Sequence, residues 1–275
     1  MKYLNLGCGY TYSHNSEWVN LDFVSTGEQV IAHNLLNGIP FENDAFDLVY
    51  HSHVLEHFTK KSGKKFLQEC YRVLKKGAIL RIAIPDLERI TKLYLEMLEN
   101  GMKEPTNLQI KADYDWMLLE MYDQTVRNNT GGDMLNYLSQ KDMHNEAFVF
   151  ERIGIEGKSI RDKYKNYNIK IQPKRKQRLT IKSIINQIKH NLKYWALTKD
   201  DLKNLAIGRF RSHGEIHQWM YDRYSLTMLL LEIGFTEINI KTANTSTISN
   251  WTSFQLDSLN GETRKPDSLF IEAIK

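Results

Sequence analysis

The chain has 275 residues and a mass of 32.3 kDa, which is enough for one large domain with a full hydrophobic core. Hydrophobic residues make up 41% of it and charged residues 25%, which excludes collagen-like, low-complexity and wholly disordered proteins. Its apolar runs fall far short of the ~20 residues that span a bilayer. No charged-then-apolar leader follows Met1, and the two cysteines, Cys8 and Cys70, are typical of a reducing compartment. We therefore expect a cytoplasmic protein.

The net charge of +4 is unevenly distributed. Residues 152–193 hold 13 Lys or Arg against two acids, whereas the rest of the chain holds 24 bases against 31 acids. Such a segment usually faces an anionic partner or surface. Within it, an apolar stripe at helical spacing is typical of an interfacial amphipathic helix: Ile181, Ile184, Ile185, Ile188, Leu192 and Trp195.

Three interpretations of this basic segment stay open. It could dock the protein on the anionic inner face of a membrane, pack its stripe on the protein itself, or serve only as a solvated insertion. Nucleic acid is not the expected partner, because the regular aromatic interleaving of a single-strand platform is missing.

The first 100 residues alternate short apolar runs with longer amphipathic ones, as βαβ units around a parallel sheet do. Strands are predicted at residues 3–6, 18–21, 30–32, 46–50 and 79–84. One helix is expected to end at Gly77 and another to open at Pro85-Asp86. Only eight residues separate Gly9 from Trp18, so the first crossover helix must be a single turn or missing.

Residues 101–150 read as helical but poorly patterned, with Gly131-Gly132 as a break. Regular patterning returns with a helix at 225–232 capped by Gly234, followed by strands at 237–241 and 268–274. The sequence thus predicts an α/β fold whose core consists of residues 1–100 and 215–275. A helical, basic insertion, residues 101–214, interrupts this core and would serve acceptor recognition or surface docking.

Gly7-x-Gly9 directly follows the first predicted strand, where a bare main chain lets a ligand lie against the turn. Tyr12 stands where a dinucleotide fingerprint needs its third glycine, which counts against NAD or FAD. Asp22 ends the second strand and could accept from two ribose hydroxyls. A cap or turn role for Asp22 is the structural alternative.

Several motifs in this order resemble class I S-adenosylmethionine-dependent methyltransferases: LNLGCG at 4–9, WVNLD at 18–22, FDLVY at 46–50, HVLEH at 53–57 and RVLKKG at 72–77. GEIHQWMYD at 214–222 and PDSLFIEA at 266–273 are similar to a bacterial branch associated with polysaccharide and glycan biosynthesis. The resemblance implies a Rossmann-like sheet, mostly parallel with an antiparallel last strand, and S-adenosylmethionine as cofactor.

The resemblance also implies which residues contact the cofactor. They are Gly7, Cys8 and Gly9 at its methionine part, Asp22 at the ribose, Asn34 and Leu35 at the adenine, and Ser52 and His53 in the pocket after the fourth strand. The family usually has Asp where this chain has Asn34, and an amide can still accept from the adenine amino group but carries no charge.

Two histidine motifs bear on chemistry. His53-x-x-Glu56-His57 matches an inverted zinc-protease pattern, but a catalytic zinc needs a third protein ligand, and His51 at the strand end would point elsewhere. We therefore expect no metal. His213-x-Glu215-x-His217 is either a hydrogen-bonding loop or the source of a general base, His217.

The sequence predicts methyl transfer from S-adenosylmethionine to a hydroxyl of a glycan or related small molecule, with His53 or His217 taking the proton. Two alternatives stay open. One is a zinc hydrolase that uses His53 and His57; the other is a non-catalytic module that binds a nucleotide-like ligand.

Overall fold

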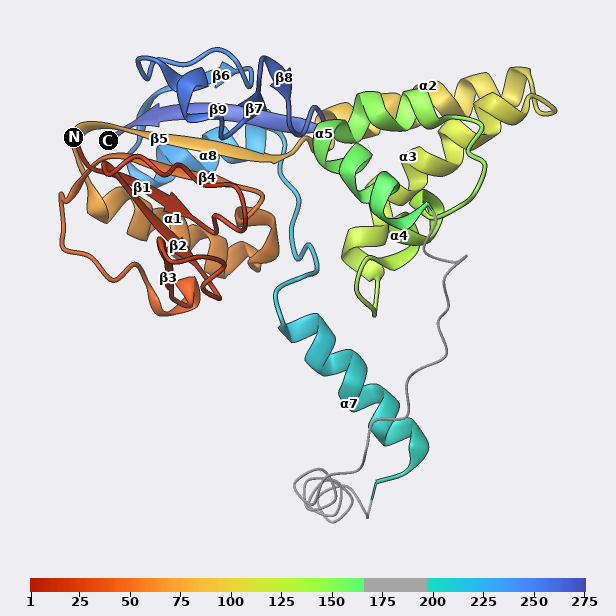
Figure 1. Cartoon of the computed structure of the whole chain (residues 1–275), viewed down its shortest axis with the longest axis horizontal. Helices are drawn as coiled ribbons and strands as arrows, with labels where there is room; N and C mark the ends of the chain where they lie inside the picture. Colours follow the sequence, from red (N-terminus) through yellow and green to blue (C-terminus); the bar gives the residue numbers. More distant parts are fainter. Residues whose placement is uncertain (166–196) are drawn as a thin grey trace.

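The computed structural model describes residues 1–165 and 197–275 (Figure 1). The apolar stripe predicted between Ile181 and Trp195 lies outside the described residues, as does most of the basic segment.

A seven-stranded sheet in the order β3-β2-β1-β4-β5-β9-β6 forms the centre of the fold. β9 runs antiparallel to both of its neighbours, and the other pairings are parallel, so the predicted Rossmann-like sheet is confirmed. The strands are β1 (Tyr3–Leu6), β2 (Trp18–Asp22), β3 (Val30–Ala32), β4 (Phe46–Ser52), β5 (Leu74–Pro85), β6 (Thr236–Lys241) and β9 (Ser268–Ile274).

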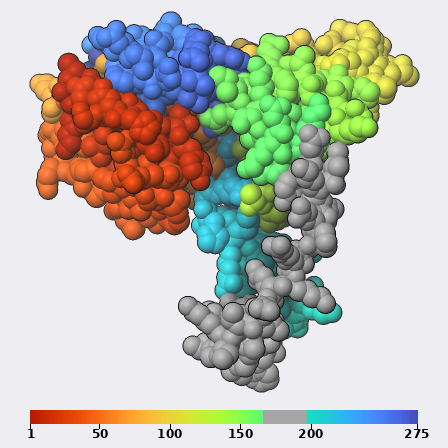
Figure 2. All heavy atoms as spheres, in the orientation of Figure 1, coloured from red at the N-terminus to blue at the C-terminus, as the bar shows by residue number. Residues whose placement is uncertain are grey.

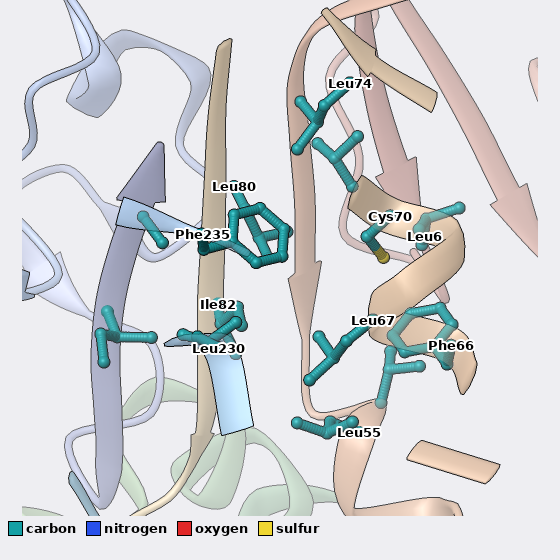
Figure 3. Close-up of a cluster of buried hydrophobic side chains, with 14 of the residues drawn as sticks. Leu6, Leu55, Phe66, Leu67, Cys70, Leu74, Leu80, Ile82, Leu230 and Phe235 are labelled. Atoms are coloured by element: carbon teal, nitrogen blue, oxygen red, sulfur yellow. The ribbon is translucent and has the colours of Figure 1, made fainter. Parts of the chain in front are cut away.

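Two helices, α1 (Lys60–Val73) and α8 (Arg223–Ile233), cover one face of the sheet. Figure 3 shows Phe66, Leu67 and Cys70 of α1 and Leu230 of α8 in the main hydrophobic core. Gly234 ends α8 in a left-handed conformation, as predicted. The prediction that Gly77 ends the preceding helix is wrong. That helix ends at Val73, and Leu74 turns straight into β5, so the left-handed Gly77 lies within the strand.

In the described part of the chain, the opposite face of the sheet is covered by a connecting segment and not by a long α-helix. Between Gly9 and Trp18 there is no helix, as the short spacing predicts. Residues 242–267 lie over this face and contain η4 (Trp251–Phe254), β7 (Ser258–Leu259) and β8 (Glu262–Thr263). The buried side chains that meet there are mostly aromatic: Tyr3, Trp18, Leu48, Tyr50, Trp251 and Leu256.

A helical layer stands beside the sheet (Figures 1 and 2). It consists of α2 (Leu87–Lys103), α3 (Leu108–Val126), α4 (Gly132–Leu138) and α5 (Glu146–Tyr164). The layer has its own core, made by Ile90, Met97, Trp116, Met117, Leu138 and Val149. It leaves the sheet after Asp86 and returns at Tyr221, where the two residues form a β-bridge and Leu87 N–H donates to the Tyr221 carbonyl.

In the described part of the basic segment, residues 152–165, two arginines form ion pairs with acidic residues of the helical layer. Arg152 lies 2.7 Å from Glu120 with both side chains buried, and buried Arg161 lies 2.9 Å from Glu146. α7 (Lys199–Ser212) stands away from the sheet in Figure 1 and buries none of its side chains. Among residues 1–165 and 197–275, every helix is too short or too polar to cross a bilayer.

Candidate active site

Two cavities meet at the carboxyl ends of β1 and β4, and Gly7 and His53 line both of them. We name the first the donor cavity. It has a volume of about 460 Å³ and contains the side chains of Asp22, Asn34 and Leu35. We name the second the acceptor cavity. It has a volume of about 540 Å³ and its wall includes Cys8, Gly9 and Ser52. Together the two cavities contain all eight predicted cofactor-binding residues.

The two glycines after β1 have different physical reasons to be glycine. Gly7 has φ +64° and a Cβ there would lie 2.3 Å from Cγ2 of Val54, so the fold itself demands glycine. Gly9 has φ +54°, and nothing lies within 4 Å of the place where its Cβ would be. The main chain at Gly9 therefore faces open space that a ligand can enter.

Asp22 and Asn34 hold the loops of the donor cavity in place. Oδ2 of Asp22 accepts a hydrogen bond of 2.8 Å from Gly9 N–H, which ties the end of β2 to the glycine turn. Oδ1 of Asn34 accepts from Leu36 N–H at 3.0 Å and caps η1 (Leu35–Asn37). Both side chains also line the cavity. A carboxylate beside an open main chain, with an amide and an apolar residue farther along, fits a ribose and an adenine, so these residues suit S-adenosylmethionine.

His53 stands on the wall between the two cavities. It has φ +53°, a conformation uncommon outside glycine, at the turn between β4 and η2 (Leu55–His57). Its Nε2 lies 2.8 Å from the Ser268 hydroxyl, and its Nδ1 lies 3.2 Å from Oε1 of Glu56. Ser268 escaped sequence reasoning because it belongs to the last strand, 215 residues away.

Glu56 is a buried carboxylate surrounded by histidines. It is 1% exposed. Burial raises the pKa of Glu56, but contact with His53 and the nearby His57 and His217 outweigh it and hold this pKa well below its usual range. The ionised form is therefore the one present at neutral pH. The sequence pattern gives Glu56 the place of the base in a zinc hydrolase, and not that of a buried carboxylate among three histidines.

His217 lies behind Glu56 rather than in either cavity. It is 5% exposed, and its Nε2 lies 3.9 Å from Oε1 of Glu56. Burial lowers its pKa to about 3, so the imidazole is neutral. We name residues 213–219 the strap, because Gln218 N–H donates to the Glu56 carbonyl at 2.7 Å and His217 N–H donates to the Gln124 carbonyl at 2.8 Å. These bonds fix the strap to the sheet edge and to α3.

Comparisons with known proteins bear on the fold and on the enzyme class. Residues 13–82, from just after the glycine turn into β5, match the model of a family described as a methyltransferase domain. No curated protein matched the sequence. A solved SAM-dependent methyltransferase from Archaeoglobus fulgidus is 13% identical, with full coverage of this chain, 86% coverage of that chain and a TM-score of 0.38. Another from Thermotoga maritima, described as a possible histamine N-methyltransferase, is 11% identical, with 100% and 82% coverage and a TM-score of 0.37. The family match agrees with the predicted enzyme class, a methyltransferase.

Proposed function

We propose that this S-adenosylmethionine-dependent methyltransferase transfers its methyl group to a hydroxyl of a glycan or a related polar small molecule, with His53 as the base. The observation that carries the proposal is the position of His53, which lies where the donor cavity and the acceptor cavity meet.

The acceptor cavity has a lining suited to a polyhydroxylated molecule. Hydroxyl groups come from Thr11, Ser52, Ser159 and Ser268, and the ring of Tyr10 beside them is 88% exposed. Hydroxyl groups both donate and accept hydrogen bonds, as sugar hydroxyls do. An exposed aromatic ring offers an apolar surface to a sugar ring.

The cofactor, when bound, supplies a methyl group already activated by a positively charged sulfur. The protein must then hold an acceptor oxygen in line with the carbon–sulfur bond, and such positioning contributes up to ~7–11 kcal/mol. Nε2 of His53 takes the hydroxyl proton as the carbon–oxygen bond forms and the carbon–sulfur bond breaks. The Ser268 hydroxyl lies 2.8 Å from this nitrogen, and the acceptor hydroxyl would take its place.

Of the two predicted bases we favour His53 over His217. Buried His217 lines neither the donor cavity nor the acceptor cavity. His53 lines both. Loss of a general base lowers a rate by about 10²–10⁴-fold.

The test is His53→Gln, with exposed His144→Gln as the matched control. We expect titration calorimetry with S-adenosylhomocysteine to give wild-type affinity within about threefold for both variants. Turnover of labelled methyl donor on a panel of sugars should fall by at least ~10² in the His53 variant only. Unchanged turnover would exclude His53 as the base, and failure of the wild type to methylate any hydroxyl acceptor while it methylates amines would exclude the hydroxyl class.

We further propose peripheral contact with an anionic membrane through residues 170–193. This stretch has eight Lys or Arg and no acid, and each base near an anionic leaflet contributes about 1 kcal/mol. Liposome flotation should recover the protein with anionic vesicles, and less of it after Lys174, Arg175, Lys176 and Arg178 are changed to Gln. Recovery with neutral vesicles alone, or with neither, would contradict the proposal.

A further inference from the structure

We propose that Glu56, His57 and His217 bind one divalent metal ion of the zinc class, behind the wall of the donor cavity. One ligand atom from each of the three lies within 4.8 Å of those of the other two. This site goes beyond methyl transfer and departs from the expectation of no metal. The sequence motif offered only His53 and His57 beside Glu56, and the fold adds His217 from the strap.

The carboxylate of Glu56 is the observation that points to a cation. Both of its oxygens are buried, and neither has a hydrogen-bond partner within residues 1–165 and 197–275. The 3.2 Å contact with Nδ1 of His53 is too oblique to be a hydrogen bond. Burying an ionised carboxylate without such partners is costly, and buried charges are normally paired or bound to metal. A cation held by both histidines would satisfy this group.

The imidazole of His57 has one nitrogen available to a metal ion. Its Nδ1 lies 3.1 Å from the carbonyl oxygen of Ile216. A carbonyl only accepts, so Nδ1 carries the proton and Nε2 keeps a free lone pair. Metal-binding histidines usually donate their second ring N–H to a carbonyl or carboxylate in this way.

The ligands come from two segments that main-chain bonds already hold together. Glu56 and His57 belong to η2, directly after β4, and His217 belongs to the strap. Gln218 N–H and Trp219 N–H both donate to the carbonyl oxygen of Glu56, at 2.7 and 3.2 Å. Metal–ligand distances of about 2.0–2.2 Å place tetrahedral ligand atoms about 3.4 Å apart. Small side-chain rotations therefore convert the observed cluster into a coordinating one.

Two imidazoles and a carboxylate suit zinc, with a water as the fourth ligand. Glu56 and His217 are almost fully buried and His57 lines the donor cavity, so the ion would lie at the wall of that cavity and away from the acceptor cavity. Such an ion positions residues rather than hydrolysing a bond. It would fasten the strap to the sheet edge and hold η2 beside the base proposed above.

The experiment measures metal directly, separately from methyl transfer. Chelator-treated protein is titrated with Zn²⁺, and bound metal is quantified by elemental analysis after gel filtration. We expect one equivalent per chain, and loss of at least ~10-fold in affinity for Glu56→Gln, His57→Gln and His217→Asn. His213→Gln, which changes an exposed histidine of the same strap, should retain wild-type zinc binding.

Cobalt substitution provides the second readout, since Co²⁺ bound by two imidazoles and a carboxylate absorbs visible light and free Co²⁺ in buffer absorbs far more weakly. Variants are compared only when circular dichroism and a cooperative thermal transition show a folded chain, and His57→Gln, at a half-buried position, is the mildest of the three. The proposal is overturned by wild-type protein that takes up no stoichiometric Zn²⁺, or by full metal retention in the folded His57 variant. Zinc binding without any methyl transfer would refute the proposed function and leave this site standing.

Discussion

The most demanding stability prediction concerns Arg81, a charged residue in the middle of the central strand β5. It is 0% exposed, and its guanidinium lies 2.7 Å from Asp257 and 2.6 Å from Glu272, both buried. Arg81→Met keeps the length of the side chain but leaves Asp257 without its cation and Glu272 with Lys241 alone, at 3.8 Å. Removing one partner of a buried ion pair costs about 3–5 kcal/mol. Because Glu272 also accepts hydrogen bonds from Ser246 and Thr247, we expect the lower half of that range.

Thermal and urea unfolding measure this loss. For a chain of this size each kcal/mol corresponds to roughly 2–4 °C, so a loss of about 3–4 kcal/mol lowers the Tm by roughly 6–16 °C. Lys158→Met is the control, because Lys158 and Glu262 form an ion pair of 2.6 Å at the surface. Exposed pairs contribute at most ~1 kcal/mol. Equal, small losses in the two variants would refute the view that Arg81 neutralises this part of the core.

The same variant has a distinctive pH dependence. Burial raises the pKa of Asp257 even with Arg81 beside it, and loss of the guanidinium raises that pKa further. A carboxyl group whose pKa is higher in the folded state binds a proton on folding. The free-energy cost of burying the ionised carboxylate is therefore present at neutral pH, and it is lost as the pH falls through the pKa of the folded state. The stability gap between wild type and Arg81→Met should narrow from pH 7 to pH 5, and a constant gap would contradict this assignment.

Substitutions of Gly7 and Gly9 distinguish effects on folding from effects on donor binding, and a substitution of His51 tests the effect of burial on a histidine. Gly7→Ala should prevent stable folding because its Cβ would meet Val54. Gly9→Ala should fold, at a cost of ~1–2 kcal/mol for its positive φ. It should lose roughly 10-fold in S-adenosylhomocysteine affinity by calorimetry, because Gly9 N–H holds Asp22, which lines the donor cavity. Wild-type affinity for S-adenosylhomocysteine in the Gly9 variant would contradict a role of the Gly9 main chain in donor binding. Burial lowers the pKa of His51 from 6.5 to about 4. As the pH drops from 6.5 toward 4, His51 therefore takes up a proton in the unfolded chain but not in the folded one. The free energy of unfolding of the wild type should fall over this range by up to ~1.4 kcal/mol per pH unit. His51→Leu should show a shallower fall in urea unfolding at pH 7 and pH 5, and identical slopes would contradict the burial argument.

Local patterns predicted the sheet well, and the residues expected to contact the cofactor lie near one another because they follow strands directly. Gly7, Gly9 and Asp22 each come at the carboxyl end of a strand, and parallel strands bring those ends to one edge. The misplaced helix end at Gly77 has a local cause as well. Left-handed glycine is typical of a helix end, but it also occurs where a strand turns, as it does within β5.

Contacts between distant positions could not be predicted in this way. Glu56 and His217 are far apart in the chain, and only the return of the strap brings them together. Arg81 was visible as a charge inside an apolar strand, but its partner Asp257 lies 176 residues away. The helices of residues 101–150 looked poorly patterned because their apolar side chains pack partly against α2 rather than against the sheet.

The bridge between Asp86 and Tyr221 has a consequence for how this architecture can vary. The chain leaves the sheet at Asp86 and returns to it at Tyr221, and these two residues are bridged to each other. The sheet can therefore form with segments of different length between them. Related enzymes could replace the segment between Asp86 and Tyr221 and so change the acceptor that they recognise, while the residues proposed to bind the methyl donor stay unchanged.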